Sequence, residues 1–151
     1  MAGGSGARSA AAALARACSG VLARVPLASG LLTGKLTAAT TFEATDHRRY
    51  NRHGESFDVG ETFAGVDYAT GLEVVEELKA LVPEGVTLAQ AALRWILMHD
   101  GITTAIPGAK TPEQARANAA AADLPPLPPE TMARVAELYE TRIKPQVHQR
   151  W

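Results

Sequence analysis

The stretch that decides the fold is residues 102–118, which read I-T-T-A-I-P-G-A-K-T-P-E-Q-A-R-A-N. Its first five residues are β-branched or small, which predicts a short buried strand that runs into a turn at Gly108. A helix should follow, because Thr111 is a good N-cap, Pro112 suits the first helical position, and Gln114 can complete a capping box. The stretch therefore predicts a strand, a glycine turn and a capped helix.

The same turn is a candidate phosphate site. Lys110 lies directly before the helix, whose free N-terminal N–H groups favour an anion. Gly108 lets a ligand come close to the backbone. A purely structural interpretation is the alternative, because any strand-to-helix connection has a turn and a cap. Lys110 and Gly108 together favour the binding site.

Length and composition predict one globular domain. The chain has 151 residues, of which 46% are hydrophobic and 21% are charged. A net charge of -1 gives no general electrostatic reason to expect nucleic acid or an anionic membrane as a partner. No apolar run approaches the length of a membrane span. The charge is uneven, because residues 1–42 carry +4 and no acid, and the remainder therefore carries -5.

Residues 1–19 form an Ala/Gly-rich leader. An acid-free start with Arg8 and Arg16 is compatible with an organelle transit peptide. We favour a small alanine-rich helix or a poorly ordered leader, because the arginines are few and the apolar residues are mostly alanine. The single Cys18 excludes an internal disulfide, agrees with a reducing cytoplasm, and is expected to be a packing residue.

A second strand is predicted over residues 20–25, again as a buried one, and Pro26 ends it. The loop that follows contains Gly30 and Gly34, which allow close backbone approach to a ligand. Lys35 can meet the charge of a phosphate. Taken alone this signal is weak, because glycine loops after strands are common.

Residues 36–67 show no helical or strand period and are polar. A loop of this length is uncommon in a compact domain unless it is a lid, a binding loop or disordered. His47 and His53 are six residues apart and flanked by arginines, which makes a poor metal site because nearby cations disfavour another. A solvated basic loop is the favoured interpretation.

Helices are predicted over residues 68–82, from Leu88 to a stop at Gly101, and from about residue 130. Thr87 and Gln90 form a capping box for the second of these. The expected buried positions are Leu72, Val75, Leu78 and Val82 in the first helix, Leu88, Ala91, Ala92, Trp95 and Ile96 in the second, and Met132, Val135, Ala136 and Tyr139 in the third. The polar tail ends on Trp151, and it is either disordered or folded over a pocket.

The predicted order is strand, loop, helix, helix, strand, helix, helix. Strands that alternate with helices predict an α/β fold with a parallel sheet. Binding of phosphate by loops after two successive strands is typical of strands seven and eight of a (β/α)8 TIM barrel. A full barrel usually needs ~250 residues, and this sequence predicts two strands. We therefore expect a partial barrel.

Four ordered motifs resemble the C-terminal half of an aldo/keto reductase. They are P-L-A-S-G-L-L-T-G-K at residues 26–35, N-R-H-G-E-S-F-D-V-G-E-T-F-A-G-V at 51–66, L-A-Q-A-A-L-R-W-I-L at 88–97, and I-P-G-A-K-T-P-E-Q-A-R-A-N at 106–118. The resemblance covers roughly residues 20–151, whereas residues 1–19 do not resemble the family.

This resemblance implies a (β/α)8 barrel that binds NADPH in extended form and transfers hydride to a small-molecule carbonyl. The residues that match the family's nicotinamide and pyrophosphate loop are Pro26, Leu27, Ala28, Gly30, Gly34 and Lys35. Those that match its adenosine 2'-phosphate and adenine loop are Gly108, Ala109, Lys110, Gln114 and Asn118.

The chain departs from the family in two respects. Ala117 stands where the family commonly has a glutamate on the adenine amino group. The family's catalytic Asp, Tyr, Lys and His belong to earlier barrel strands that this sequence lacks, and Tyr50, Tyr68 and Tyr139 match none of them.

We therefore expect a truncated, cytoplasmic aldo/keto reductase that is inactive alone and self-associates through exposed strand edges. Binding of nucleic acid, of a membrane or of a metal is not expected. The alternatives are a non-catalytic NADPH-binding or subunit-interaction module and a non-functional fragment.

Overall fold

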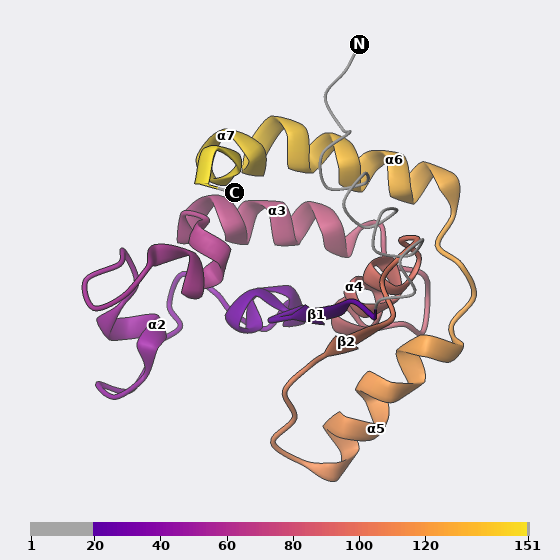
Figure 1. Ribbon diagram of the computed structural model, residues 1–151, viewed down its shortest axis with the longest axis horizontal. Coiled ribbons are helices and arrows are strands. Elements are labelled where there is room, and N and C mark those ends of the chain that lie inside the picture. The colour runs from indigo at the N-terminus through magenta and orange to yellow at the C-terminus, as the bar shows by residue number, and fades with distance from the viewer. Residues whose placement is uncertain (1–19, 151) are drawn as a thin grey trace.

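The structure is a computed structural model that describes residues 20–150 (Figure 1). The predictions for the leader, for Cys18 and for Trp151 lie outside these residues. The strands and helices, in chain order, are β1 (Leu22–Arg24), α2 (His47–Tyr50), α3 (Tyr68–Lys79), α4 (Leu88–Leu97), β2 (Thr104–Ile106), α5 (Pro112–Ala120), α6 (Pro129–Leu138) and α7 (Lys144–Val147). The predicted strands and helices occur in the predicted order, and two short helices, α2 and α7, were not predicted.

The two strands pair in parallel, as predicted, with Leu22 opposite Thr104 and Arg24 opposite Ile106. The prediction that they are buried is wrong. Leu22 is 59% exposed and Ile106 is 53% exposed. Parallel strands are buried when further strands and helices cover both faces of their sheet. Within residues 20–150 the sheet has two strands, so much of it stays open to solvent.

Helix α4 begins as predicted. Thr87 N–H donates to Gln90 Oε1 at 3.1 Å, and Gln90 N–H donates to Thr87 Oγ1 at 3.2 Å, so the capping box is complete. Trp95 lines an apolar cavity of about 180 Å³ between α3, α4 and α6, which agrees with its predicted place in the core. The preceding helix α3 ends at Lys79, three residues earlier than predicted.

The C-terminal residues dock along α3, as Figure 1 shows for α6 and α7. Glu77 of α3 accepts from Arg134 at 2.7 Å and from Arg142 at 3.3 Å. Leu138 and Val147 are each 3% exposed, so both helices contribute to the core.

The predicted buried face of α6 is wrong in part. Ala136 and Tyr139 are exposed, and Leu138 is the buried residue of the helix. Met132, Val135 and Leu138 recur at three-residue spacing and form the covered face of α6, whereas Ala136 and Tyr139 lie outside it.

The long loop 36–67 is folded. Besides α2 it contains two 3-10 turns, Val59–Glu61 and Phe63–Gly65. Phe63 is 1% exposed and forms a buried cluster with Leu31 and Val75, which links the loop to α3. This loop therefore forms part of the hydrophobic core.

A buried asparagine fixes the shape of this loop. Asn51 is fully buried, and its Oδ1 accepts from the backbone N–H groups of Ser56 and Phe57, each at 2.8 Å. Its Nδ2 donates to Thr62 Oγ1 at 3.2 Å. A side chain so fully hydrogen-bonded holds the turn without a regular element. Within residues 20–150, no helix has the length and apolar character needed to cross a membrane.

Candidate functional site

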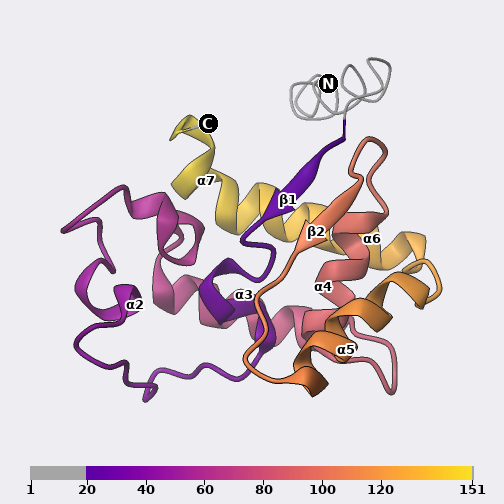
Figure 2. The ribbon, with the colours of Figure 1, turned by 60° about the horizontal axis from the view of Figure 1, so that its bottom comes forward.

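Two loops leave the same edge of the sheet, because the carboxyl ends of parallel paired strands lie together (Figure 2). The β1 loop covers residues 25–35, and the β2 loop covers residues 107–111, which lead into α5. These loops contain the two groups of predicted site residues except Gln114 and Asn118, which lie in α5. The fold therefore places both groups at one end of the strand pair.

The β1 loop is strained. Val25, Ala28 and Ser29 have φ values of 49°, 46° and 55°, in the left-handed region that side chains other than glycine seldom adopt. Gly30 follows at 94°, where glycine carries no such cost. Backbone strain of this kind persists when the surroundings over-determine it, and it gathers at functional sites. The strain marks the β1 loop as a candidate site independently of its sequence.

Contacts from the long loop hold the strained turn. Phe63 N–H donates to Ser29 Oγ at 3.2 Å, and Arg48 Nη1 donates to the Ser29 carbonyl at 3.3 Å. A second point of attachment is Leu31, which is 5% exposed in the Phe63 cluster. The strained residues are thus tied to segments that follow them by some twenty to thirty residues.

Arg48 is itself held by a carboxylate. Asp46 Oδ1 accepts from Arg48 Nε at 2.9 Å, and Asp46 Oδ2 accepts from Arg48 Nη2 at 2.5 Å. The hydrogen bond from the Arg48 side chain is the largest cause that lowers the pKa of Asp46 to about 2. Asp46 also caps α2 through Arg48 N–H. One carboxylate thereby orients a guanidinium over the Ser29 turn.

The β2 loop is exposed and open. Gly108, Ala109 and Lys110 are all exposed, and a side chain built at Gly108 would meet no atom within 4 Å. Asn118 Nδ2 donates to the Gly108 carbonyl at 3.2 Å, which ties the loop to the second turn of α5. Backbone and ammonium donors are therefore accessible from solvent here.

The capping box predicted for α5 is half present. Thr111 Oγ1 accepts from Gln114 N–H at 3.3 Å, as expected of the N-cap. The Gln114 side chain, however, accepts from Lys110 N–H at 2.7 Å and not from the backbone of Thr111. The turn brings the Lys110 N–H under the first helical turn, so Gln114 braces the lysine that the sequence singles out.

Glu113 already places a negative charge at the start of α5. Hydrogen bonding, first from its own backbone N–H and then from the Thr111 hydroxyl, lowers the pKa of the Glu113 carboxyl. The N-terminus of the helix thus stabilises an anion in this structure. A ligand phosphate at the same place would displace this exposed carboxylate.

The remaining predicted residues differ in accessibility. Pro26 is buried, Leu27 and Ala28 are half-buried, and Lys35 is exposed. A side chain at Gly34 would meet Lys79 Cε at 3.0 Å, so on that side this glycine faces α3.

Asp46, Arg48 and Ser29 were not predicted as site residues. The first two belong to the segment that was predicted to be a solvated basic loop, although both are half-buried. Asp46 could have been recognised from the sequence, because an aspartate directly before the run H-R-R-Y is a typical N-cap and predicts a short helix there. The left-handed conformation of Ser29 has no signal in the residue itself, because its contacts come from distant segments.

Comparison with known proteins supplies the family. The profile described as the aldo/keto reductase family matches residues 15–140. A search of curated protein sequences finds no significant match. Among solved structures, the apo form of aldo-keto reductase AKR11C1 from Bacillus halodurans is similar, with a TM-score of 0.51 and 21% sequence identity. The alignment covers 84% of this chain and 36% of that one.

The chain therefore belongs to the aldo/keto reductase family, as the motifs predict. The structural likeness shows a shared fold. This chain corresponds to little more than a third of the length of the solved structure.

Proposed function

We propose that this chain is the cofactor-side part of an aldo/keto reductase (β/α)8 barrel, and that it binds NADPH across the β1 and β2 loops. The observation that carries the proposal is that both loops lie at one edge of the parallel strand pair. The β1 loop is strained and held by Arg48, whereas the β2 loop is open and places Lys110 before a helix N-terminus. Rigid backbone on one side and accessible cationic donors on the other suit an extended dinucleotide.

The residues present fit this cofactor at its phosphates. The open space at Gly108 leaves room for a phosphate to approach the backbone, and Lys110 supplies a charge beside it. The family's adenine glutamate is replaced by Ala117, so we place most of the affinity in the phosphate contacts. When bound, NADPH supplies a hydride, and the chain's own residues position it.

Carbonyl reduction also needs an acid to protonate the oxygen of the aldehyde or ketone. Tyr68 Oη donates to the Thr37 carbonyl at 2.9 Å, so its proton is directed at the backbone. Tyr139 Oη lies 3.0 Å from His148 Nδ1, and both residues are exposed and lie beyond the end of α6. In the described part of the chain, no hydrogen bond joins a tyrosine to a lysine. We propose that turnover requires groups this chain does not carry.

A second candidate function is subunit interaction, and the exposed strands favour it. Leu22, Val25 and Ile106 are large apolar side chains that are 46% to 59% exposed along the strand pair. Open strand edges with apolar side chains favour pairing with another chain. We propose that the chain associates with itself or with a chain that carries barrel strands. Sedimentation should show concentration-dependent association, and a monomer at all concentrations would exclude it.

Cofactor titration tests the main proposal. Lys110 at a helix N-terminus favours the additional phosphate of NADPH, and a charge-assisted hydrogen bond contributes ~1.5 to 3 kcal/mol. NADPH should therefore bind about ten- to a hundredfold more tightly than NADH, and Lys110→Ala should remove most of this preference. The control is Lys144→Ala, which removes a lysine at the start of the distant α7 that pairs with Glu140. Equal dissociation constants in the unmutated chain would refute the proposal.

Turnover is the separate test of catalysis. NADPH oxidation, followed by its absorbance with a panel of aldehydes and ketones, should stay at background in highly purified protein. The absence of a positioned acid removes roughly 10²- to 10⁴-fold of rate. Turnover that Tyr139→Phe abolishes would show that the Tyr139–His148 pair acts as the acid and that the chain is catalytically complete.

A further inference from the structure

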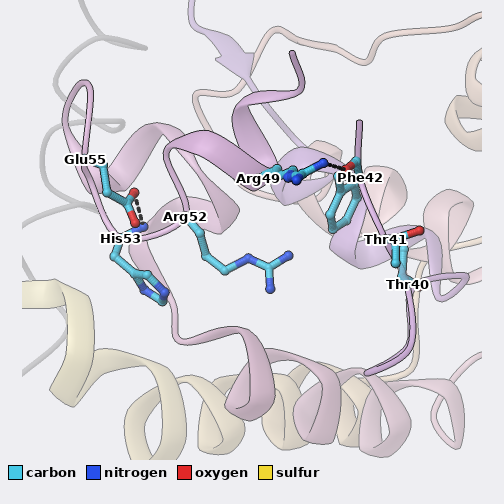
Figure 3. A pocket seen from close by; sticks show the side chains of 7 residues that line it. All are labelled: Thr40, Thr41, Phe42, Arg49, Arg52, His53 and Glu55. Atoms are coloured by element: carbon cyan, nitrogen blue, oxygen red, sulfur yellow. Dashed lines mark hydrogen bonds between the residues drawn. The ribbon is translucent and has the colours of Figure 1, made fainter. Parts of the chain in front are cut away.

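A cavity of about 480 Å³, lined mainly by polar and charged residues, lies in the long loop, away from the β2 loop. One wall is residues 40–42, and the other is formed by α2 and the turn after it, with Arg49, Arg52 and His53 (Figure 3). The α2 region and α5 lie at opposite sides of the molecule in Figures 1 and 2. The cavity is therefore separate from the Lys110 turn.

Arg52 is held in place at this cavity. Its Nε donates to the Arg48 carbonyl at 3.1 Å, and its guanidinium lies 4.6 Å from the ring centre of Tyr68 and 5.6 Å from that of Phe42. Figure 3 shows the guanidinium reaching into the space between the two walls. Stacking on aromatic rings fixes the plane of the group while its terminal N–H donors stay available.

The cavity contains cations that other parts of the chain do not neutralise. Six of the nine arginines in residues 20–150 pair with a carboxylate. The other three, Arg49, Arg52 and Arg94, each donate to backbone carbonyls, and Arg49 and Arg52 both line this cavity. One carboxylate, that of Glu55, lies at the rim, and it accepts from the backbone N–H of His53 at 2.9 Å.

We propose that this cavity binds a small organic phosphate monoester through Arg52 and Arg49. The guanidinium fork matches two phosphate oxygens, and a dianion balances two unpaired arginines. The Phe42 ring offers an apolar surface for the organic part of the ligand. The volume lies within the range of ~300 to 1,000 Å³ typical of small-molecule sites. This site is additional to the proposed cofactor loops.

Calorimetric titration of the full chain with phenyl phosphate, inorganic phosphate and phenol tests the proposal. Phenyl phosphate should bind most tightly, inorganic phosphate more weakly, and phenol not at all. Arg52→Gln should weaken the binding of phenyl phosphate at least about tenfold, because a charge-assisted hydrogen bond is lost. Arg52→Lys keeps the charge without the guanidinium fork, so its affinity for phenyl phosphate should lie between those of the unmutated chain and of Arg52→Gln. Arg116→Gln removes an exposed arginine from α5 and should change nothing.

Two further measurements keep the test independent of folding and of the cofactor loops. Thr41→Glu places a negative charge in the cavity without touching the Arg52 stack, so it should also abolish binding. NADP⁺ should not compete, and Lys110→Ala should bind phenyl phosphate normally. Unchanged affinity in Arg52→Gln or in Thr41→Glu, or displacement by NADP⁺, would overturn the proposal.

Discussion

The β1 and β2 loops have the same place in the fold and opposite physical characters. In the β1 loop, Ser29 has a left-handed backbone and receives hydrogen bonds from Phe63 and Arg48. In the β2 loop, Gly108 is exposed and has free space around it. The first loop is shaped before any ligand arrives, whereas the second keeps its donors accessible to solvent.

This difference shows how one candidate site can combine rigidity with access. Strain in the β1 loop is offset by burial of Leu31 and Phe63 and by the Asp46–Arg48 pair. Such a loop holds its conformation at no further entropic cost when a ligand binds. The β2 loop has little burial to offset strain and shows none. The long loop 36–67 is thus responsible for the rigid half of the site.

The largest expected effect comes from removing the asparagine that shapes the long loop. Asn51→Ala leaves the part-buried N–H groups of Ser56 and Phe57 and the buried Thr62 hydroxyl without their partner. We expect a loss of about 3 kcal/mol, because each buried unsatisfied group costs ~1 to 3 kcal/mol. Denaturant unfolding with tryptophan fluorescence measures it.

Asn118→Ala is the matched change in the β2 region. It removes one hydrogen bond to the Gly108 carbonyl at a half-exposed position, so the loss should stay below about 1 kcal/mol. Equal losses of unfolding free energy in Asn51→Ala and Asn118→Ala would contradict the contrast between the buried, hydrogen-bonded long loop and the open β2 loop.

A smaller effect is expected from acid. The folded-state pKa of Asp46 is lowered from 3.8 to about 2, so the carboxylate stabilises the fold above pH 4. That stability is lost as the pH falls from about 4 to 2, and it amounts to at most about 2 kcal/mol. Asp46→Asn should flatten the pH dependence of stability in this window. Glu113→Gln should change it less, because solvent screens the exposed carboxylate. The reverse order would contradict the assignment.

The last comparison is between two glycine substitutions, one in each loop. Gly30→Ala places a side chain at a φ of 94° and 3.5 Å from Arg48 Nη1, and it should cost about 1 kcal/mol of stability. The added methyl group of Gly108→Ala meets no atom within 4 Å, so the stability should be unchanged. The same methyl group should weaken the binding of NADPH, because it obstructs the approach of the phosphate. Thermal unfolding and cofactor titration of both variants separate the two effects. A destabilised Gly108→Ala with unchanged cofactor affinity would show that the β2 turn is structural.

Much of the fold follows from local signals. The Thr87 capping box, the Thr111 cap and Pro112 at the start of α5 were predictable, because a cap satisfies backbone groups within four residues of itself. The exposure of Leu22 and Ile106 was not predictable, because alternation and β-propensity do not tell how many neighbouring strands will cover a strand.

The sequence alone determined the family, the parallel order of the strands and the two glycine loops, since these depend on motifs and on residues close along the chain. The tertiary structure alone decided that Arg48 is held by Asp46 over Ser29, and that Arg52 lies stacked over Tyr68 at a cavity. The physical reason is that the contacts of Arg48 with Ser29 and of Arg52 with Tyr68 join residues sixteen or more positions apart. Their geometry depends on how the long loop closes over α3, and loop closure of this kind leaves no periodic pattern in the residues that it brings together.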